Sequence, residues 1–306
     1  MGSPEFALPG LRALAGAYEV VGVVTQPDRA AGRGRGLTPP PVKRLALELG
    51  LHVLQPEKLR QPEAMQALRD LQPELIVVAA FGQILKPEVL DLPAQGCLNV
   101  HASLLPRWRG AAPIHAAILH GDALTGVTLM RMDPGLDTGP LLSRRETQIA
   151  PTETAGELYA RLAALGAELL METLPAYLEG RLLPQPQPEQ GATYAPMLKK
   201  EEGRLDLHLG AVELERRVRA FNPWPGAWLT WQGGMLKVHR ARVQPGEAPE
   251  GEALVSGSLP ALGTARDLLL LEEVQPAGGR PMSGQAFLAG ARQWSGSHIR
   301  TAPQGL

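Results

Sequence analysis

Short runs of apolar, largely β-branched residues recur through the first half of the chain and alternate with segments that have a helical pattern. The apolar runs cover residues 20–25, 52–55, 75–80 and 97–101, and the helical segments cover residues 5–15, 41–49, 62–70 and 110–120. Runs without a polar face are typical of strands that are buried on both sides of a parallel sheet. Their alternation with helices predicts a doubly wound, mostly parallel α/β domain.

Two further strand-like segments, residues 126–132 and 141–149, follow in the middle of the chain. Because the gap between them is too short for a crossover helix, we expect them to form a mostly antiparallel hairpin. A long helical pattern runs from Thr152 to about Glu179. Three prolines within residues 184–188 then predict an extended linker.

The last third of the chain has the pattern of a smaller, separate domain. An amphipathic helix at residues 211–220 precedes four short strand-like segments, at residues 227–231, 235–243, 251–256 and 268–273. Glycine and proline turns separate these segments, which is typical of a small β-barrel of OB-like type. We therefore expect a first domain at residues 1–183, a linker at 184–203 and a β-barrel-like domain at 204–306.

The first helix begins almost at the N-terminus, with no strand before it. In a Rossmann-like domain that helix packs on the preceding strand, and the first strand is usually central in the sheet. A missing central strand removes about five apolar residues, each worth ~1.5–3 kcal/mol when buried. That sum rivals the whole stability of a domain, ~5–15 kcal/mol. We therefore expect the sequence to be short at its N-terminus.

Composition and charge narrow the possible classes of protein. The chain has 306 residues, 44% hydrophobic, and a formal net charge of −1, which excludes a disordered chain and a strongly basic nucleic-acid binder. A single cysteine, Cys97, allows no internal disulfide and favours a reducing cytoplasm. The histidines share no metal-ligand spacing, so we predict no metal. No apolar run is long enough to span a membrane, and we expect a monomer.

One stretch concentrates side chains that suit acyl transfer. Asn99 and His101 lie two residues apart at the end of a predicted strand, and Asp137 lies in the glycine-rich turn 133–140. An amide can stabilise an oxyanion, an imidazole can move protons, and a carboxylate can orient the imidazole. An incoming amine makes a Ser or Cys nucleophile unnecessary. Taken singly, however, the three residues also fit a strand cap, a buried core histidine and a turn former.

Basic residues gather in two other places. The Gly/Arg/Pro segment 26–43 contains Arg29, Arg33 and Arg35. Arginines spaced by glycines suit a phosphate backbone, although a passive surface loop has the same composition. The segment lacks both the P-loop and the GxGxxG signature. The last domain adds Arg216, Arg217 and Arg219 on its helix and Lys237, Arg240 and Arg242 on a strand. The three helix positions cannot all face one way.

The longer motifs identify a family resemblance. Asn-x-His and Ser-Leu-Leu-Pro-x-x-Arg-Gly run from Asn99 to Gly110, and Leu-Asp-Thr-Gly follows at residues 136–139. These motifs resemble the folate-dependent formyltransferases, particularly those that act on a charged initiator tRNA. Thr25-Gln-Pro-Asp-Arg29 and Arg219-Ala-Phe-Asn-Pro-Trp-Pro225 match as well, and the resemblance runs from Gly2 to about Gln293.

The resemblance implies the activity and the site. The formyl group of 10-formyltetrahydrofolate, the co-substrate, would pass to the α-amino group of methionyl initiator tRNA, for translation initiation. Asn99, His101 and Asp137 would be catalytic. Folate would contact Phe81, Gly82, Gln83, Ile84, Leu85, Ser103, Leu104, Leu105, Pro106, Asp133, Gly135 and Leu136. The tRNA would contact Arg29, Arg33, Arg35, Arg216, Arg217, Lys237 and Arg240.

Two other readings stay open at this stage. A formyltransferase for a small amine, such as glycinamide ribonucleotide or an amino sugar, would require neither the Gly/Arg segment nor a second domain. A non-catalytic RNA- or folate-binding protein would be expected to lack one of Asn99, His101 and Asp137, and all three are present.

Overall fold

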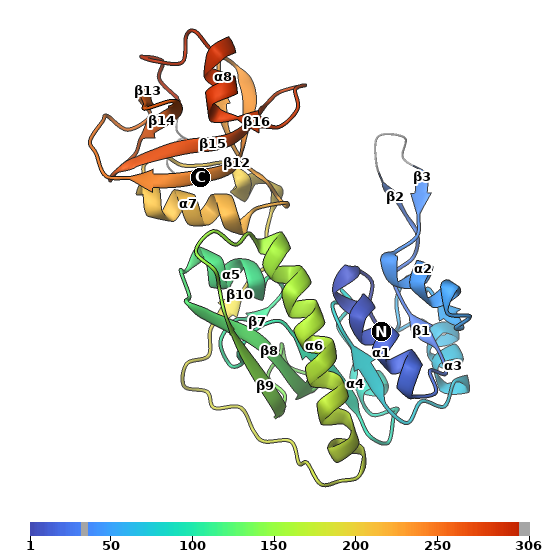
Figure 1. Cartoon of the computed structure of the whole chain (residues 1–306). Coiled ribbons are helices and arrows are strands. Elements are labelled where there is room, and N and C mark those ends of the chain that lie inside the picture. Colours follow the sequence, from blue (N-terminus) through green and yellow to red (C-terminus); the bar gives the residue numbers. More distant parts are fainter. Residues whose placement is uncertain (32–35, 300–306) are drawn as a thin grey trace. The chain divides into compact units, whose positions relative to one another are not determined.

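The computed structural model describes residues 1–31 and 36–299, and the chain folds into two compact units. The first unit comprises Met1–Pro113, Leu124–Gln148 and Tyr159–Ala195, and the second comprises Ile114–Ala123, Ile149–Leu158 and the chain from Pro196 onward. The boundaries expected from the sequence, 1–183, 184–203 and 204–306, stay a prediction. Figure 1 labels the elements in chain order.

Helices and strands alternate along the first 195 residues. The helices are η1 (Glu5–Ala7), α1 (Leu8–Ala17), α2 (Pro41–Glu48), α3 (Pro62–Asp70), α4 (Pro87–Leu90), α5 (Pro113–Leu119) and α6 (Ala155–Leu178). The strands are β1 (Val23–Val24), β2 (Arg29–Ala31), β3 (Gly36–Thr38), β4 (Val53–Leu54), β5 (Ile76–Val78), β6 (Cys97–His101), β7 (Arg109–Gly110), β8 (Leu124–Arg131), β9 (Leu141–Gln148) and β10 (Tyr194–Ala195).

The main sheet of the first unit mixes parallel and antiparallel strands. Its order is β5-β6-β8-β9, in which β5 and β6 are parallel while β8 is antiparallel to both of its neighbours. A separate parallel pair joins β1 to β4. The α/β class and the antiparallel β8–β9 hairpin are thus confirmed. The sheet is less parallel than expected, because β8, the first strand of the hairpin, runs antiparallel to β6.

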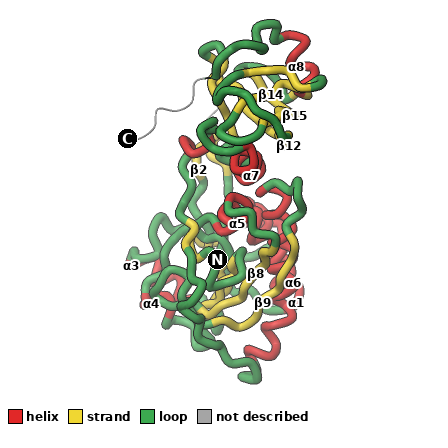
Figure 2. Tube along the Cα trace, turned by 90° about the vertical axis from the view of Figure 1, so that its left-hand side faces the viewer, coloured by secondary structure: helices red, strands yellow, loops and turns green. Residues whose placement is uncertain are grey.

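Helix α6 packs along the face of the main sheet, as both views of the chain show (Figure 1 and Figure 2). A Cβ added to Gly166 of α6 would lie 2.7 Å from Val100 Cγ1 of β6. Glycine therefore lets the helix approach the strand closely. Tyr177, near the end of α6, donates a hydrogen bond of 2.5 Å to the carbonyl oxygen of Gln95.

Residues Met1 and Gly2 lie between the two parallel pairs. The Met1 amino group donates to Val77 O at 2.6 Å, and Gly2 N donates to Val24 O at 3.0 Å. The chain start therefore connects β5 with β1 at the position where a first strand was expected. A cavity of about 540 Å³ adjoins this connection, and Val100 and Leu170 are among its lining residues. Whether the sequence is short at its N-terminus stays a prediction.

The Gly/Arg segment is not a plain loop at its two ends. Strands β2 and β3 pair antiparallel, with Ala30 opposite Leu37, whereas the sequence suggested irregular structure throughout. Such a ladder forms through backbone hydrogen bonds, which the composition of the segment does not reveal. Arg33 and Arg35 lie outside the described residues.

The second unit is built on an antiparallel sheet. Its elements are η2 (Lys200–Gly203), α7 (Ala211–Ala220), β11 (Ala227–Trp231), β12 (Gly234–Gln244), β13 (Ala253–Ser256), β14 (Leu259–Gly263), β15 (Leu268–Pro276), β16 (Met282–Ser283) and α8 (Gly284–Gly290). The strand order is β11-β12-β15-β14-β13, with β16 on β15. Phe287 and Trp294 make an edge-to-face contact in its core, with ring centroids 5.4 Å apart.

Candidate active site

The strand β6 supplies two of the three candidate catalytic side chains. All five of its residues are buried, and β5 and β8 flank it on either side, so the strand has no open edge. Asn99 is 9% exposed and His101 is 6% exposed. Since side chains two residues apart project from the same face of a strand, the pair points together toward the turn between β8 and β9.

Asp137 connects both strand residues to that turn. Its Oδ1 accepts a hydrogen bond of 3.3 Å from Asn99 Nδ2, and its Oδ2 accepts one of 2.8 Å from the backbone N–H of Gly110. Oδ2 also lies 3.7 Å from His101 Nδ1. The φ of Asp137 is +53°, in the left-handed region that Asp adopts more readily than most residues. The structure thus brings together the three residues that the sequence singled out.

The contacts of His101 distinguish its two ring nitrogens. Nε2 lies 2.9 Å from the carbonyl oxygen of Trp108. A carbonyl only accepts hydrogen bonds, so Nε2 carries the proton of the neutral ring. Nδ1, on the side of Asp137, is then the basic nitrogen. The arrangement suits a general base whose protonated form faces a carboxylate.

Two residues that sequence reasoning missed support the turn of Asp137. Gln187 Nε2 donates to the carbonyl oxygens of Asp137 and Gly139 at 2.9 and 2.6 Å. Its Oε1 accepts from Nε and Nη2 of Arg109, at 3.2 and 3.0 Å. Arg109 is 1% exposed. The Arg-Gly motif could have indicated that Arg109 belongs to the site. Gln187 lies among prolines in the segment expected to be a linker, where nothing in the sequence points to a role in the site.

Gly110 is required by the local backbone. Its φ is +112°, and an added Cβ would lie 2.7 Å from the carbonyl oxygen of Ala195. Strands β7 and β10 therefore come close enough to pair only with glycine at this position. The pairing in turn holds the Gly110 N–H that binds Asp137.

Cys97 adjoins the site but is chemically inert. Burial raises the pKa of its thiol to about 12, and its Sγ lies 3.6 Å from the carbonyl oxygen of Val89. The thiolate form that a nucleophile needs is therefore absent near neutral pH. The site suits transfer to an incoming amine rather than to a cysteine.

The chain matches known protein families over both units. A model described as formyl transferase matches residues 9–174, which contain Asn99, His101 and Asp137. A second, the formyl transferase C-terminal domain, matches residues 197–292. The chain belongs to the formyl transferase family.

Relatives within this formyl transferase family are similar over nearly the whole chain. The methionyl-tRNA formyltransferase of Myxococcus xanthus (strain DK1622) is 53% identical over 298 residues, covering 97% of this chain and 96% of the relative. That of Chloroflexus aggregans is 51% identical over 295 residues, covering 95% of this chain and 96% of the relative.

Solved structures share the formyl transferase fold at low sequence identity. An N-formyltransferase from Helicobacter canadensis, in complex with folinic acid and dTDP-3-aminofucose, is 16% identical with a TM-score of 0.65, covering 88% of this chain and 96% of that one. A methionyl-tRNA formyltransferase from Clostridium thermocellum is 19% identical with a TM-score of 0.51, covering 66% and 87%. These two likenesses show a common fold.

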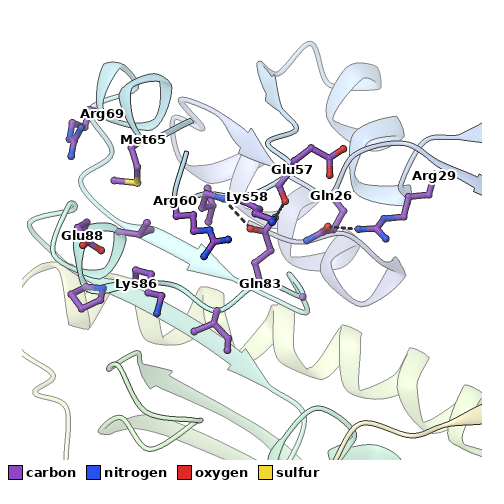
Figure 3. Close-up of a pocket in the computed structure, with 15 residues that line it drawn as sticks. Gln26, Arg29, Glu57, Lys58, Arg60, Met65, Arg69, Gln83, Lys86 and Glu88 are labelled. Carbon is purple, nitrogen blue, oxygen red and sulfur yellow. Dashed lines mark hydrogen bonds between the residues drawn. The ribbon is translucent and has the colours of Figure 1, made fainter. Parts of the chain in front are cut away.

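The expected folate residues of this formyl transferase occupy three surroundings. In the first, Phe81 and Leu85 are buried in the core, Ile84 is 81% exposed, and Gln83 Oε1 accepts from Leu59 N at 3.1 Å. Gly82 has a φ of +80°. The exposed part of this segment therefore consists of backbone and the Ile84 side chain, and it lines a pocket of about 900 Å³ (Figure 3).

The second surrounding is the segment 103–106, where Ser103 and Leu105 are fully buried and Leu104 and Pro106 are half-buried. Ser103 Oγ donates to Arg107 O at 2.6 Å, so its hydroxyl already has a protein partner.

The third surrounding is the turn after β8. The Asp133 carboxylate accepts from the backbone N–H of Gly135 at 3.0 Å and from Thr138 Oγ1 at 2.8 Å. Leu136 is 57% exposed. The carboxylate of Asp133 thus shapes the turn, and the backbone and Leu136 are the parts that face outward.

The described basic residues expected to bind tRNA differ in exposure. Arg29, Lys237 and Arg240 are exposed, whereas Arg216 and Arg217 of α7 are half-buried. Arg240 lies 3.8 Å from Glu273, and Arg29 donates to Gln26 Oε1 at 3.3 Å. Lys237, which has no ion pair within the described part of the chain, shares the exposed face of β12 with Arg240.

Across residues 1–31 and 36–299, no group of three or more His, Cys, Asp or Glu side chains could hold a metal ion. Within the same ranges, no helix is both long and apolar enough to cross a membrane.

Proposed function

We propose that this protein transfers the formyl group of 10-formyltetrahydrofolate to the α-amino group of methionyl initiator tRNA, and so makes N-formylmethionyl-tRNA for translation initiation. The observation that carries the proposal is the contact of Asp137 with both Asn99 and His101 in a member of the formyl transferase family. The names of the relatives, at about half identity over almost the full chain, support the acceptor.

Asn99 stabilises the negative charge that forms on the formyl oxygen when the amine attacks. Its Nδ2 has two hydrogens, of which one is donated to Asp137 Oδ1. The other hydrogen is therefore available to an oxyanion, and the contact with Asp137 holds the amide in place. Loss of one such donor typically costs ~10²–10³ in rate.

His101 accepts the proton that the amine loses as the new C–N bond forms. The acceptor is Nδ1, because Nε2 is held by Trp108 O. The same proton is then given to the N10 nitrogen of the folate as its bond to the formyl carbon breaks. A water bound by both Nδ1 and Asp137 Oδ2 would connect these groups, and the carboxylate stabilises the imidazolium.

The fit of folate rests on the three surroundings described above. A pterin ring carries paired hydrogen-bond donors and acceptors. Exposed backbone at Gly82 and around Leu136 offers the N–H and C=O groups that can bind them. Phe81, Leu85, Ser103 and Leu105 contribute through packing and backbone position, because their side chains are buried. The assignment comes from the family resemblance and from this exposure pattern.

The wider organisation is also part of the proposal. Residues 1–183 carry catalysis and folate binding, 184–203 link the domains, and 204–306 form an OB-like β-barrel that binds tRNA with the segment around Arg29. The six-stranded antiparallel sheet of the second unit supports the barrel. The protein acts as a monomer in the cytoplasm.

A direct assay tests the function against the small-acceptor alternative. Purified protein receives 10-formyltetrahydrofolate and, in separate reactions, methionyl initiator tRNA, glycinamide ribonucleotide or a nucleotide-linked amino sugar. We expect formylation of the charged tRNA only. Transfer to a small amine, with the charged tRNA unreactive, would contradict the proposal.

A further inference from the structure

Thr193 holds the chain on both sides of Trp108 through three hydrogen bonds. Its Oγ1 accepts from Trp108 N at 2.9 Å, and its carbonyl oxygen accepts from Arg109 N at 2.9 Å. Its own N–H donates to Pro106 O at 3.3 Å. Thr193 follows Trp108 by 85 positions and lies in the segment 184–203 that was expected to be a linker. That segment therefore supports the loop beside the candidate catalytic residues.

One of these three bonds orients the peptide group that contacts His101. The carbonyl oxygen of Trp108, 2.9 Å from His101 Nε2, belongs to the same planar unit as the N–H of Arg109. Because Thr193 O accepts from that N–H, the opposite end of the plane, the carbonyl, points at the imidazole. Its direction matters, since a C=O makes Nε2 the protonated nitrogen, whereas an N–H in its place would make Nε2 an acceptor.

The backbone of Trp108 has a conformation that depends on this support. Its φ of +62° lies in the left-handed region, which is uncommon for a bulky residue. Such conformations persist only where surrounding contacts hold them. Thr193 Oγ1 supplies one of these contacts to a residue that is only 6% exposed, so little water can replace it. Relaxation of φ toward the ordinary negative range would turn the Trp108 carbonyl away from His101.

We propose that Thr193 is a positioning residue that sets the tautomer of His101 through the backbone of Trp108. With the proton held on Nε2, Nδ1 stays unprotonated on the side of Asp137, 3.7 Å from its Oδ2. Without the hydroxyl of Thr193, a fraction of His101 carries the proton on Nδ1 and cannot accept another there. The effect on the reaction rests on the proposed function, whereas the tautomer is a property of the free protein.

Nuclear magnetic resonance of protein with ¹⁵N-labelled histidine tests the proposal without any substrate. Long-range ¹H–¹⁵N correlations, recorded where the ring is neutral, show which nitrogen of His101 carries the proton, and His101→Gln identifies its signals. We expect the proton on Nε2 in wild type. Thr193→Val keeps the shape but removes the acceptor, so we expect a detectable fraction with the proton on Nδ1. Thr193→Ser keeps the oxygen and should match wild type.

Steady-state kinetics of the same variants measure the consequence for formyl transfer to methionyl initiator tRNA. In Thr193→Val we expect kcat to fall about tenfold, part of the ~10²–10⁴ that a general base contributes. KM should stay nearly unchanged, and Thr193→Ser should restore kcat. The matched control is Thr173→Val, which removes a hydroxyl that is bonded to Leu169 O at 2.6 Å, on a residue that is 6% exposed in α6. It should keep the wild-type tautomer and kcat, and thermal unfolding reports the stability of each variant.

Four results would contradict part of this scheme, and they have different meanings. A wild-type proton on Nδ1 overturns the inference whatever the stability of the variants. A wild-type tautomer in folded Thr193→Val also overturns it, as does a Thr193→Ser variant that behaves like Thr193→Val. A wild-type protein that formylates no acceptor, but in which Thr193→Val shifts the tautomer, overturns the proposed function and supports the role of Thr193.

Discussion

Gln187 donates a hydrogen bond of 2.9 Å to the main-chain oxygen of Asp137, although the two residues lie 50 positions apart. The buried guanidinium of Arg109 holds the other end of the same carboxamide. The turn that directs the Asp137 carboxylate at His101 is therefore fixed through its backbone as well as its side chain. Gln187 is a positioning residue, since it reaches none of the three candidate catalytic side chains.

The Gln187→Glu variant tests whether Gln187 positions the turn of Asp137 or only packs against it. It keeps a partner for Arg109 but replaces the N–H donor with an oxygen that repels the carbonyls of Asp137 and Gly139. We expect kcat to fall about tenfold, the cost of ~1.4 kcal/mol of misplaced alignment, with KM for tRNA nearly unchanged. Steady-state kinetics of this variant, compared with those of Gln187→Ala, measure the change in kcat and KM. If kcat stays at the wild-type value in both variants, the positioning role is wrong.

The charge at position 99 tests the oxyanion role. Asn99→Asp removes the donor and adds a second carboxylate 3.3 Å from Asp137, so kcat/KM should fall further than the ~10²–10³ expected for Asn99→Ala. Thermal unfolding of both variants serves as the control for folding. A more active Asp variant would rule out the donation of a hydrogen bond to the oxyanion.

The His101→Gln variant tests the proton transfer. An amide can still donate to Trp108 O, so the buried position keeps its partner, but the base is lost. We expect kcat to fall by ~10²–10⁴, with folate binding retained in an equilibrium measurement. Activity within about threefold of wild type would eliminate His101 as the base.

Substitutions in the basic segment that follows β1 test its role in tRNA binding. Phosphate contacts release counterions, so the R33Q/R35Q variant should have a weaker affinity for charged tRNA and a salt dependence shallower by up to about one unit of slope per lost contact. Folate affinity should not change. The R12Q/R44Q variant, which removes two exposed cations outside this segment, serves as the matched control. Identical slopes for R33Q/R35Q and wild type would remove the segment from the tRNA site.

His115 makes stability depend on pH. Burial lowers its pKa below the ordinary 6.5, against a smaller opposing effect of the Trp224 backbone, and its Nδ1 has no hydrogen-bond partner among the described residues. The unfolded chain therefore binds a proton that the folded chain resists. The free energy of unfolding is fully present above about pH 6.5 and decreases as the pH falls through that value, by at most ~1.4 kcal/mol per pH unit.

Denaturant unfolding between pH 7 and pH 5 measures this effect. The His115→Gln variant should lose stability less steeply than wild type over that range. The His52→Gln variant changes an exposed histidine and should follow wild type. Equal slopes for His115→Gln and wild type would show that this residue titrates alike in the folded and unfolded chains.

The outline of the site could be predicted from the sequence because two of its three candidate catalytic residues lie on one short strand. Asn99 and His101 share a five-residue strand, and β8 runs antiparallel to it, so the chain enters the turn of Asp137 beside Leu98 and the turn then reaches Asn99. The role of Gln187 did not follow, since it depends on β10 pairing with β7 more than 80 residues away. Distant pairings of two-residue strands leave no periodic pattern to detect.

The missed elements of the second unit have a similar cause. Strand β14 contains Pro260 and ends at Gly263, residues that usually argue against a strand. Helix α8 has glycine at both ends and depends on the Ser283 side chain, which accepts a hydrogen bond from Ala286 N at 3.2 Å. In both places the packed core outweighs the local preference of the chain.

Strand β6 lies between two neighbours and is buried along its whole length. Its amide hydrogens should exchange with solvent only when the first unit opens globally, because its ladder bonds have no exposed edge. On heating, the catalytic geometry should therefore be lost together with the cooperative unfolding of that unit. The segments proposed to bind the substrates include exposed residues such as Arg29 and Ile84, so loss of substrate affinity should set in at a lower temperature than loss of the catalytic geometry.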